Sequence, residues 1–145
     1  MTRISSFSNG SHRAGVIRLW QEVFGYSAAH HDPGLNIDKK LAVGDDLFFV
    51  ALDGDAVIGT ILAGYDGHRG WLYSVAVDAG HRKQGVGADL VAHAEQALAV
   101  RGCMKINLQI IGGNEAVAAF YESLGFLIEP RVSMGKRIAA NVPGA

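Results

Sequence analysis

One segment, residues 75–88, restricts the fold more than any other, because it predicts a strand, a glycine turn and a helix in immediate succession. It reads VAVDAGHRKQGVGA, with apolar residues first, basic residues in the middle and two glycines near the end. The helix is predicted from Gly85 to Arg101, since apolar side chains recur at helical spacing and Gly102 follows as a stop signal. The next apolar run, residues 104–111, predicts a strand and completes one βαβ unit. The apolar stripe of the helix comprises Val86, Leu90, Val91, Ala94, Ala97 and Leu98.

Hairpins are predicted before this unit. Asp53-Gly54-Asp55 is a turn signal, because Asp-Gly tolerates the positive φ of hairpin turns, and residues 66–70 turn the chain again. The predicted strands are residues 4–7, 47–52, 57–64, 71–77 and 132–138. Period-two alternation along 71–77 predicts one shared face for Trp71, Tyr73, Val75 and Val77.

Three further helices complete the prediction. Ser11 is expected to cap the first, whose buried stripe would hold Val16, Leu19, Trp20, Val23 and Phe24. Residues 27–34 are expected to form a loop, and Asn36 to cap a short helix with Ile37 and Leu41. The last helix is predicted from Asn114 to Gly125. The layout is α+β, and the early hairpins argue against a doubly wound dinucleotide fold.

The turn itself is suited to phosphate. A helix N-terminus has free backbone N–H groups and a partial positive charge. Gly85 and Gly87 leave that backbone bare, while Arg82 and Lys83 add charge. The alternative is a surface turn whose glycines only reverse the chain. A P-loop would need Gly-Lys-Ser/Thr here, and a dinucleotide fingerprint would need a glycine in place of Leu90.

Composition limits the remaining classes of function. Lys and Arg number 13 against 14 Asp and Glu, so no general attraction to nucleic acid or to a membrane surface is expected. The single cysteine, Cys103, forms no internal disulfide, and His30-His31-Asp32 is expected to be a solvated loop and not a metal site. The chain predicts one domain over 1–140 with a tail at 141–145. The absence of a signal-like or membrane-length apolar run predicts a cytoplasmic protein.

A second motif covers residues 114–126, NEAVAAFYESLGF. Asn114 and Tyr121 are seven positions apart, which places them two helical turns apart on one face. Gly125 would end the helix, and Phe126 would pack back. The alternative for Tyr121 is a half-buried helix aromatic without a chemical role.

With both motifs, the chain resembles the GNAT N-acetyltransferase superfamily over nearly its full length. Residues 64–70 (GYDGHRG) and 134–138 (MGKRI) look like its YpeA-type bacterial branch, which is similar to the ribosomal-protein alanine N-acetyltransferases. The resemblance implies the GNAT fold, a mixed and mostly antiparallel central sheet with helices on both faces. Ala79-Gly80 departs from the proline common in the family, and Val117 stands where alanine is common.

The resemblance further implies acetyl-CoA as donor and no metal. Transfer would be direct, in a ternary complex, to a small amine or to a peptide or protein N-terminus. Tyr121 would protonate the leaving thiolate, and the Val75 N–H would polarise the carbonyl oxygen. The implied donor-binding residues are Val75, Ala76, Val77, Arg82, Lys83, Gln84, Gly85, Val86, Gly87, Ala88, Asn114 and Tyr121.

The proton acceptor and the assembly are less defined. Asp66 and His68 lie in the turn that leads into the strand at 71–77 and are candidates to take the amine proton, since imidazole titrates near neutral pH. The alternative is an ordinary polar turn. GNAT proteins are often dimers, so a homodimer is one expected assembly. A non-catalytic acyl-CoA sensor remains a second hypothesis, although the presence of Asn114 and Tyr121 favours an enzyme.

Overall fold

The computed structural model describes residues 2–25 and 32–138 of the 145-residue chain. The strands are β1 (Thr2–Ser6), β2 (Phe48–Asp53), β3 (Ala56–Tyr65), β4 (Gly70–Val77) and β5 (Ile106–Leu108). The helices are α1 (Asn9–Phe24), α2 (Pro33–Val43), α3 (Val86–Val100) and α4 (Glu115–Ser123), with a 3₁₀ turn, η2 (Ala79–His81), before α3. The loop predicted at 27–34 falls mostly outside the described residues, and the tail at 141–145 lies wholly outside them.

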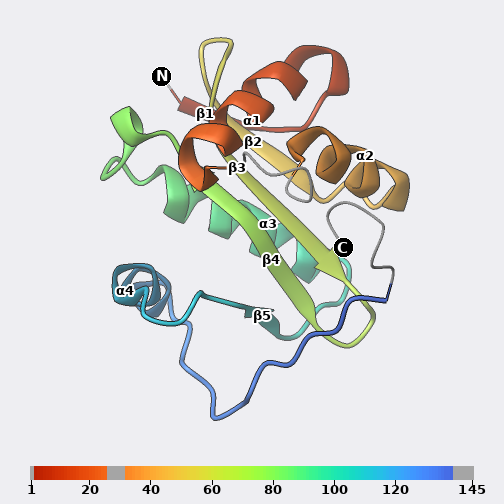
Figure 1. Ribbon diagram of the computed structural model, residues 1–145, viewed down its shortest axis with the longest axis vertical. Coiled ribbons are helices and arrows are strands. Elements are labelled where there is room, and N and C mark those ends of the chain that lie inside the picture. The colour runs from red at the N-terminus through yellow and green to blue at the C-terminus, as the bar shows by residue number, and fades with distance from the viewer. Residues whose placement is uncertain (1, 26–31, 139–145) are drawn as a thin grey trace.

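The strands form one sheet in the order β1-β2-β3-β4-β5. β1 to β4 pair antiparallel, whereas β4 and β5 pair parallel and are joined by α3. Figure 1 shows α1 and α2 on one face of the sheet and α3 on the other. The prediction of an α+β fold, with a mostly antiparallel sheet between helices and one βαβ unit, is confirmed.

β2 is buried on both faces, because its side chains alternate between two hydrophobic cores. Phe48, Val50 and Leu52 pack with α1 and α2, whereas Phe49 and Ala51 pack with α3. The predicted stripe of α3 is confirmed, with all members buried except the partly buried Ala97. Covering both faces explains why β2 is a continuous apolar run and not an alternating one.

Both N-terminal helices begin earlier than predicted. α1 starts before Ser11, which therefore lies inside the helix and does not cap it. α2 starts at Pro33, and the Asp32 carboxylate accepts a hydrogen bond from the Gly34 N–H at 2.9 Å. Asn36 is consequently an interior residue of α2. Asp followed by Pro at the first helical position is the stronger start signal, because proline lacks only an N–H that would be unsatisfied there.

The predicted alternation along β4 is wrong beyond the middle of the strand. The pairing between β3 and β4 shifts by one residue there, and Ser74 adopts a φ of 51°. An extra residue of this kind is a β-bulge, which changes the face to which the following side chains point. Trp71 and Tyr73 are therefore exposed, whereas Val75 and Val77 pack against the α3 core.

A buried chain of hydrogen bonds connects α1 to this bulge. The Trp20 indole N–H donates to the Thr60 hydroxyl at 2.8 Å, and the hydroxyl donates to the Ser74 carbonyl at 2.9 Å. Trp20 and Thr60 are both fully buried, at 1% and 0% exposure. Their polar groups must therefore be satisfied inside the protein, which fixes the bulge relative to α1.

The sheet ends sooner than predicted. β5 has only three residues instead of the expected 104–111, and residues 132–138 form no strand in the described part of the chain. A side-chain contact connects β5 to the segment that follows α4, with Asn107 Nδ2 donating to Glu129 at 2.7 Å. A second side-chain bond, from Gln109 Nε2 to the Ser133 hydroxyl at 2.5 Å, also connects these segments.

The described residues contain neither a membrane-spanning helix nor a metal-binding cluster. Among residues 2–25 and 32–138, no helix is both long and apolar enough to cross a membrane. Over the same ranges, no group of three or more His, Cys, Asp or Glu side chains is arranged to hold a metal ion. His30 and His31 lie outside these ranges. Cys103 is half-buried and packs at the margin of the α3 core.

We predict that Thr60→Val lowers the free energy of unfolding by about 1–3 kcal/mol, because it leaves the Trp20 N–H and the Ser74 carbonyl buried without their partner. Equilibrium denaturation in urea measures the change. Thr60→Ser retains the hydroxyl and serves as the matched control. Equal stability of Thr60→Val and Thr60→Ser would show that the buried chain does not hold the bulge.

Candidate functional site

The C-terminal half of β4 has one open edge. β4 and β5 pair only from Gly70↔Ile106 to Leu72↔Leu108. Beyond that point β5 diverges from β4 (Figure 1), and residues 73–77 pair with β3 alone among the described strands. The predicted donor-binding residues Val75, Ala76 and Val77 lie on this edge. Along this edge the backbone faces no other described strand and can bond an extended ligand as an added strand would, and the Val77 carbonyl also accepts a bond from Arg82 Nε at 3.4 Å.

The N-terminus of α3 follows directly and is uncapped. Gly85 is the N-cap, with φ of 82° and no side-chain capping bond. The first intrahelical bond runs from the Asp89 N–H to the Gly85 carbonyl at 3.0 Å. The N–H groups of Val86, Gly87 and Ala88 therefore have no partner within the helix. Together with the helix dipole, these donors form a site for an anion.

The turn before α3 is shaped to present backbone and not side chains. Lys83 adopts φ of 62°, and Gly85 also has positive φ. Turns with such conformations can direct successive N–H groups toward one anion. A Cβ placed on Gly85 would meet nothing within 4 Å, so space lies open over the turn. These features fit a diphosphate better than a turn that only reverses the chain.

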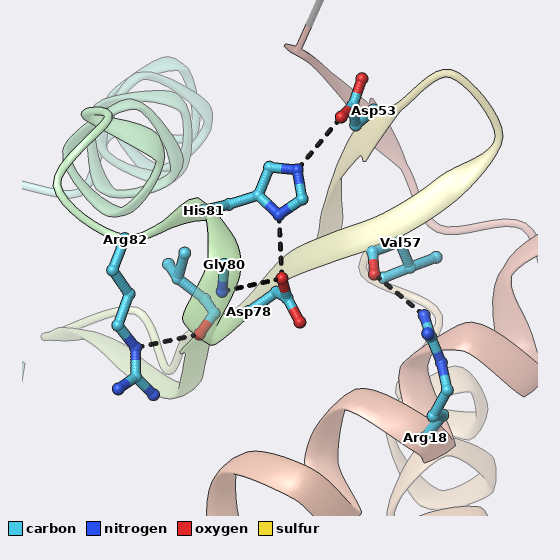
Figure 2. A network of polar contacts seen from close by, with 8 residues as sticks. Arg18, Asp53, Val57, Asp78, Gly80, His81 and Arg82 are labelled. Carbon is cyan, nitrogen blue, oxygen red and sulfur yellow. Dashed lines mark hydrogen bonds and ion pairs between the residues drawn. The ribbon is translucent and has the colours of Figure 1, made fainter.

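Gly87 permits a close contact between three elements. A Cβ on Gly87 would lie 3.1 Å from Phe120 Cζ of α4 and 3.7 Å from Val77 Cγ2 of β4. The start of α3, the end of β4 and the middle of α4 therefore meet at this glycine. Arg82 contributes to the same junction, since its Nε donates to the Val77 carbonyl at 3.4 Å (Figure 2). The two sequence motifs, far apart in the chain, are thus neighbours in space.

A polar network fixes the first part of the turn. His81 Nδ1 lies 2.9 Å from Asp78 Oδ2, and His81 Nε2 lies 3.1 Å from Asp53 Oδ2 (Figure 2). Asp78 also accepts a hydrogen bond from the Gly80 N–H at 3.1 Å. The bond to Asp78, followed by the bond to Asp53, raises the pKa of His81, and the bond to His81 lowers the pKa of each aspartate. These shifts favour an imidazolium between two carboxylates.

α4 ends in a Schellman motif that explains the sequence pattern at 121–126. Gly125 has φ of 95°, and its N–H donates to the Glu122 carbonyl at 3.1 Å. The Phe126 N–H donates to the Tyr121 carbonyl at 3.1 Å, and the two rings meet edge to face. Glycine supplies the left-handed residue that this motif requires, and the aromatic contact closes it. The predicted stop at Gly125 and the packing of Phe126 are confirmed.

Asn114 and Tyr121 stand on α4 as predicted. Asn114 is the N-cap, and its side-chain oxygen accepts a bond from the Val117 N–H at 3.4 Å, which leaves the amide N–H₂ group for a ligand. Tyr121 is 7% exposed, and its ring packs edge to face on Phe120. Burial raises the pKa of Tyr121 to about 12. The hydroxyl is therefore protonated at neutral pH, the state in which it can donate a proton.

Asp66 and His68 lie away from these residues, at the other end of β4. Asp66 Oδ1 accepts bonds from the N–H groups of His68 and Arg69, both at 2.7 Å. The bond from Arg69 and then that from His68 lower the pKa of Asp66, which makes its carboxylate a weaker base. His68 is exposed, and its Nδ1 lies 3.4 Å from an Arg69 guanidinium nitrogen. The carboxylate therefore caps the turn, and the imidazole remains in contact with solvent.

A hollow of about 300 Å³ opens beside the bulge of β4. Lys40 is buried, and its ammonium group contacts the Asp45 carboxylate at 2.9 Å, the Ala63 carbonyl at 2.5 Å and the Tyr73 hydroxyl at 3.4 Å. The lysine therefore holds the Tyr73 side chain at the wall of the hollow. The lining residues are Lys40, Val43, Asp45, Gly64, Tyr65, Asp66, Trp71 and Tyr73.

Two parts of this arrangement were not predicted from the sequence. The bridge from His81 to Asp53 spans 28 positions, and no local pattern links the two residues. The hollow depends on the bulge, because alternation predicts one shared face for Trp71, Tyr73, Val75 and Val77, whereas the bulge separates the two exposed aromatic residues from the two valines.

Comparisons with known proteins agree with this geometry. The model of the "Acetyltransferase (GNAT) family" matches residues 13–126. A curated acetyltransferase of Sodalis glossinidius is 40% identical over 124 residues, which cover 85% of this chain and 87% of that protein.

Solved structures show the same fold at lower identity. The ribosomal-protein-S18-alanine N-acetyltransferase of Escherichia coli has a TM-score of 0.68 at 22% identity, covering 86% of this chain and 77% of that one. AAC(6')-Iy, solved with a bisubstrate analogue containing CoA, has a TM-score of 0.73 at 18% identity, covering 96% and 99%. The family match, the close relative and the shared fold lead to one conclusion: the chain belongs to the GNAT family of acetyltransferases.

Proposed function

We propose that this acetyltransferase moves an acetyl group from acetyl-CoA to a primary amine, either a small amine or the N-terminus of a peptide or protein, by direct transfer in a ternary complex. The observation that carries this proposal is the open edge of β4 leading into the uncapped N-terminus of α3. GNAT enzymes use acetyl-CoA and act on amines. The edge and the helix start together supply the backbone donors and acceptors that such a donor substrate needs.

The donor would bind mainly to backbone. Its diphosphate would accept hydrogen bonds from the N–H groups of Val86, Gly87 and Ala88, with Arg82 and Lys83 adding positive charge and Gln84 at the rim. Its pantetheine arm would extend along residues 75–77 of β4, with the Asn114 amide on the opposite side. The thioester would then lie where β4 and β5 part, beside Tyr73.

The chemistry follows from this placement. The neutral amine nitrogen attacks the thioester carbonyl carbon, and the Val75 N–H stabilises the negative charge that develops on the carbonyl oxygen. The C–S bond breaks as the N–C bond forms, and Tyr121 donates its proton to the departing sulfur. No enzyme nucleophile is required, so Cys103 has no role in the transfer.

The amine proton must also leave. Asp66 and His68 are the candidates, and we favour His68, because two backbone N–H groups stabilise the ionised Asp66 and weaken it as a base. The imidazole would receive the proton through water, since it lies in the turn before β4 and is exposed. Asp66 would then fix the turn that carries His68.

The hollow beside Tyr73 is the proposed acceptor site. It adjoins the point where the thioester would lie, and it presents the aromatic side chains of Trp71 and Tyr73, which are 36% and 43% exposed. The charge of Lys40 is already offset by Asp45. The hollow therefore offers aromatic surface and oxygen acceptors to an amine-bearing group.

A non-catalytic module that binds acyl-CoA is the alternative. Such a module would use the same edge of β4 and the same helix N-terminus. Such a module would need the Tyr121 ring only for packing in the α3 core, whereas the proposed enzyme also uses its hydroxyl as the proton donor.

Gln84→Glu is predicted to weaken acetyl-CoA binding by about fivefold or more, because it places a negative charge beside the diphosphate without removing any contact of the exposed Gln84 side chain. The dissociation constant from calorimetry and the ligand-induced rise in melting temperature measure the effect. Gln21→Glu on α1 adds the same charge elsewhere and should bind normally. Absence of any thermal shift in wild type at millimolar acetyl-CoA would refute the donor assignment.

Tyr121→Phe is predicted to lower kcat by about 10- to 100-fold while the dissociation constant of acetyl-CoA stays within about twofold, because only the proton donor is removed. Steady-state kinetics and calorimetry on the same preparation separate the two effects. An unchanged kcat would remove Tyr121 from the general-acid role.

A screen of acceptors tests the hollow. Thiol release from acetyl-CoA should reveal turnover with at least one class among amines, amino acids and short peptides. With that acceptor, Trp71→Ala should raise the acceptor KM about tenfold, the loss expected for one aromatic contact, and leave the acetyl-CoA KM unchanged. Failure with every class would favour the non-catalytic module, and an unchanged acceptor KM would place the acceptor elsewhere.

A further inference from the structure

His81 joins two carboxylates from different parts of the chain. Asp78 directly follows β4, whereas Asp53 is the last residue of β2, at the start of the β2–β3 hairpin. Figure 2 shows the imidazole between them, with one ring nitrogen directed at each carboxylate. A side chain of the turn before α3 is thereby fixed to the body of the sheet.

The geometry requires a doubly protonated ring. Both carboxylates only accept hydrogen bonds, and both distances, 2.9 and 3.1 Å, are those of a hydrogen bond. A neutral imidazole has a single N–H and can satisfy only one of the two acceptors. The full bridge therefore exists only while His81 carries its proton.

The bridge acts on the half of the turn after Asp78, whose other polar link to the sheet among the described residues is the bond from Arg82 Nε to the Val77 carbonyl at 3.4 Å. The Asp78 N–H donates to the Ile58 carbonyl at 2.7 Å, which fixes the start of the turn to β3. Beyond His81 the side chains of Lys83 and Gln84 are exposed. Since the positive-φ residues Lys83 and Gly85 follow at once, a shift of His81 would change where the N–H groups of the turn point.

The charges around His81 also favour the bridge. The imidazole faces the carboxylates of Asp53 from β2 and Asp78 after β4. The positive charge of Arg18 on α1 helps to lower the pKa of Asp78, and Arg82 follows His81 in the chain. The imidazolium offsets the carboxylates next to a turn that receives an anion. Loss of its proton would remove this contribution and break half of the bridge.

We propose that His81 is a positioning residue for the donor substrate: bridged to Asp78 and Asp53, it holds the turn in the conformation that binds the diphosphate of coenzyme A. This inference rests on the proposed function, because it assumes that the turn binds the diphosphate. It assigns to the β2–β3 hairpin a part in donor binding, although the hairpin lies outside the donor site itself.

The test compares His81→Gln, Asp53→Asn and the double variant by calorimetric titration with coenzyme A. Each single variant should raise the dissociation constant about three- to tenfold, and the double variant should add little, because both remove one bridge. Asp55→Asn is the matched control on the same hairpin and should bind as wild type. Melting temperatures without ligand identify variants that are merely unfolded.

A pH series gives the readout that a purely structural role would not move. The bridge raises the pKa of His81 above its usual 6.5, so wild-type affinity should be full on the acidic side and should fall as pH rises through that raised pKa. Dividing the dissociation constant of His81→Gln by that of wild type at each pH cancels the titration of the ligand's own phosphates. This ratio should decline toward one at high pH.

Two results would overturn the inference. One is unchanged coenzyme A affinity in folded His81→Gln and Asp53→Asn, and the other is a ratio that does not vary with pH. Failure of wild type to bind coenzyme A at all is a different result, which refutes the proposed function and not the bridge in particular.

Discussion

The whole site depends on the parting of β4 from β5. Three residues of β4 pair with β5, and the next five do not. The bulge at Ser74 lies where the strands part, and the buried Thr60 hydroxyl and Trp20 indole hold it in place. Because an unpaired strand edge exposes a row of backbone donors and acceptors, a feature that most proteins cover is here the proposed place for an extended substrate.

In the proposed donor site, backbone groups would make most of the contacts to the ligand, and side chains would control their access and direction. Gly85 keeps the space over the turn open, and Gly87 lets α3, β4 and α4 meet at van der Waals distance. His81 then ties the turn to β2. The donor site is thus a property of how the elements are held, which is why substitutions outside it, at Thr60 or Asp53, are expected to matter.

Local signals in the sequence predict several of the elements and their ends. The spacing of apolar residues predicts α3, Asp-Gly predicts the β2–β3 turn, and the pattern at 121–126 predicts how α4 ends. Each of these depends on residues within a few positions of one another. The fold class and the pairing of the two motifs follow from them together with the resemblance to the family.

The remaining features depend on long-range contacts or on competition between nearby signals. The bulge at Ser74 depends on Thr60 in the neighbouring strand, so alternation alone misplaces Val75 and Val77. Residues 132–138 form no strand, and side-chain bonds from Asn107 to Glu129 and from Gln109 to Ser133 connect this region to the sheet instead. Asn36 is an acceptable cap, but Asp32 followed by Pro33 is the stronger start signal, and Ser11 lies inside a helix whose N-cap is Ser8.

The central claim, that acetyl-CoA occupies the open edge of β4 and the start of α3, is tested most directly by recording backbone amide shifts of the ¹⁵N-labelled chain during titration with acetyl-CoA. The account predicts saturable shifts concentrated at Val75–Val77 and Val86–Ala88, with small changes at Asn9–Ser11, the exposed start of α1. Saturable shifts located elsewhere, or no shifts at millimolar ligand, would contradict it.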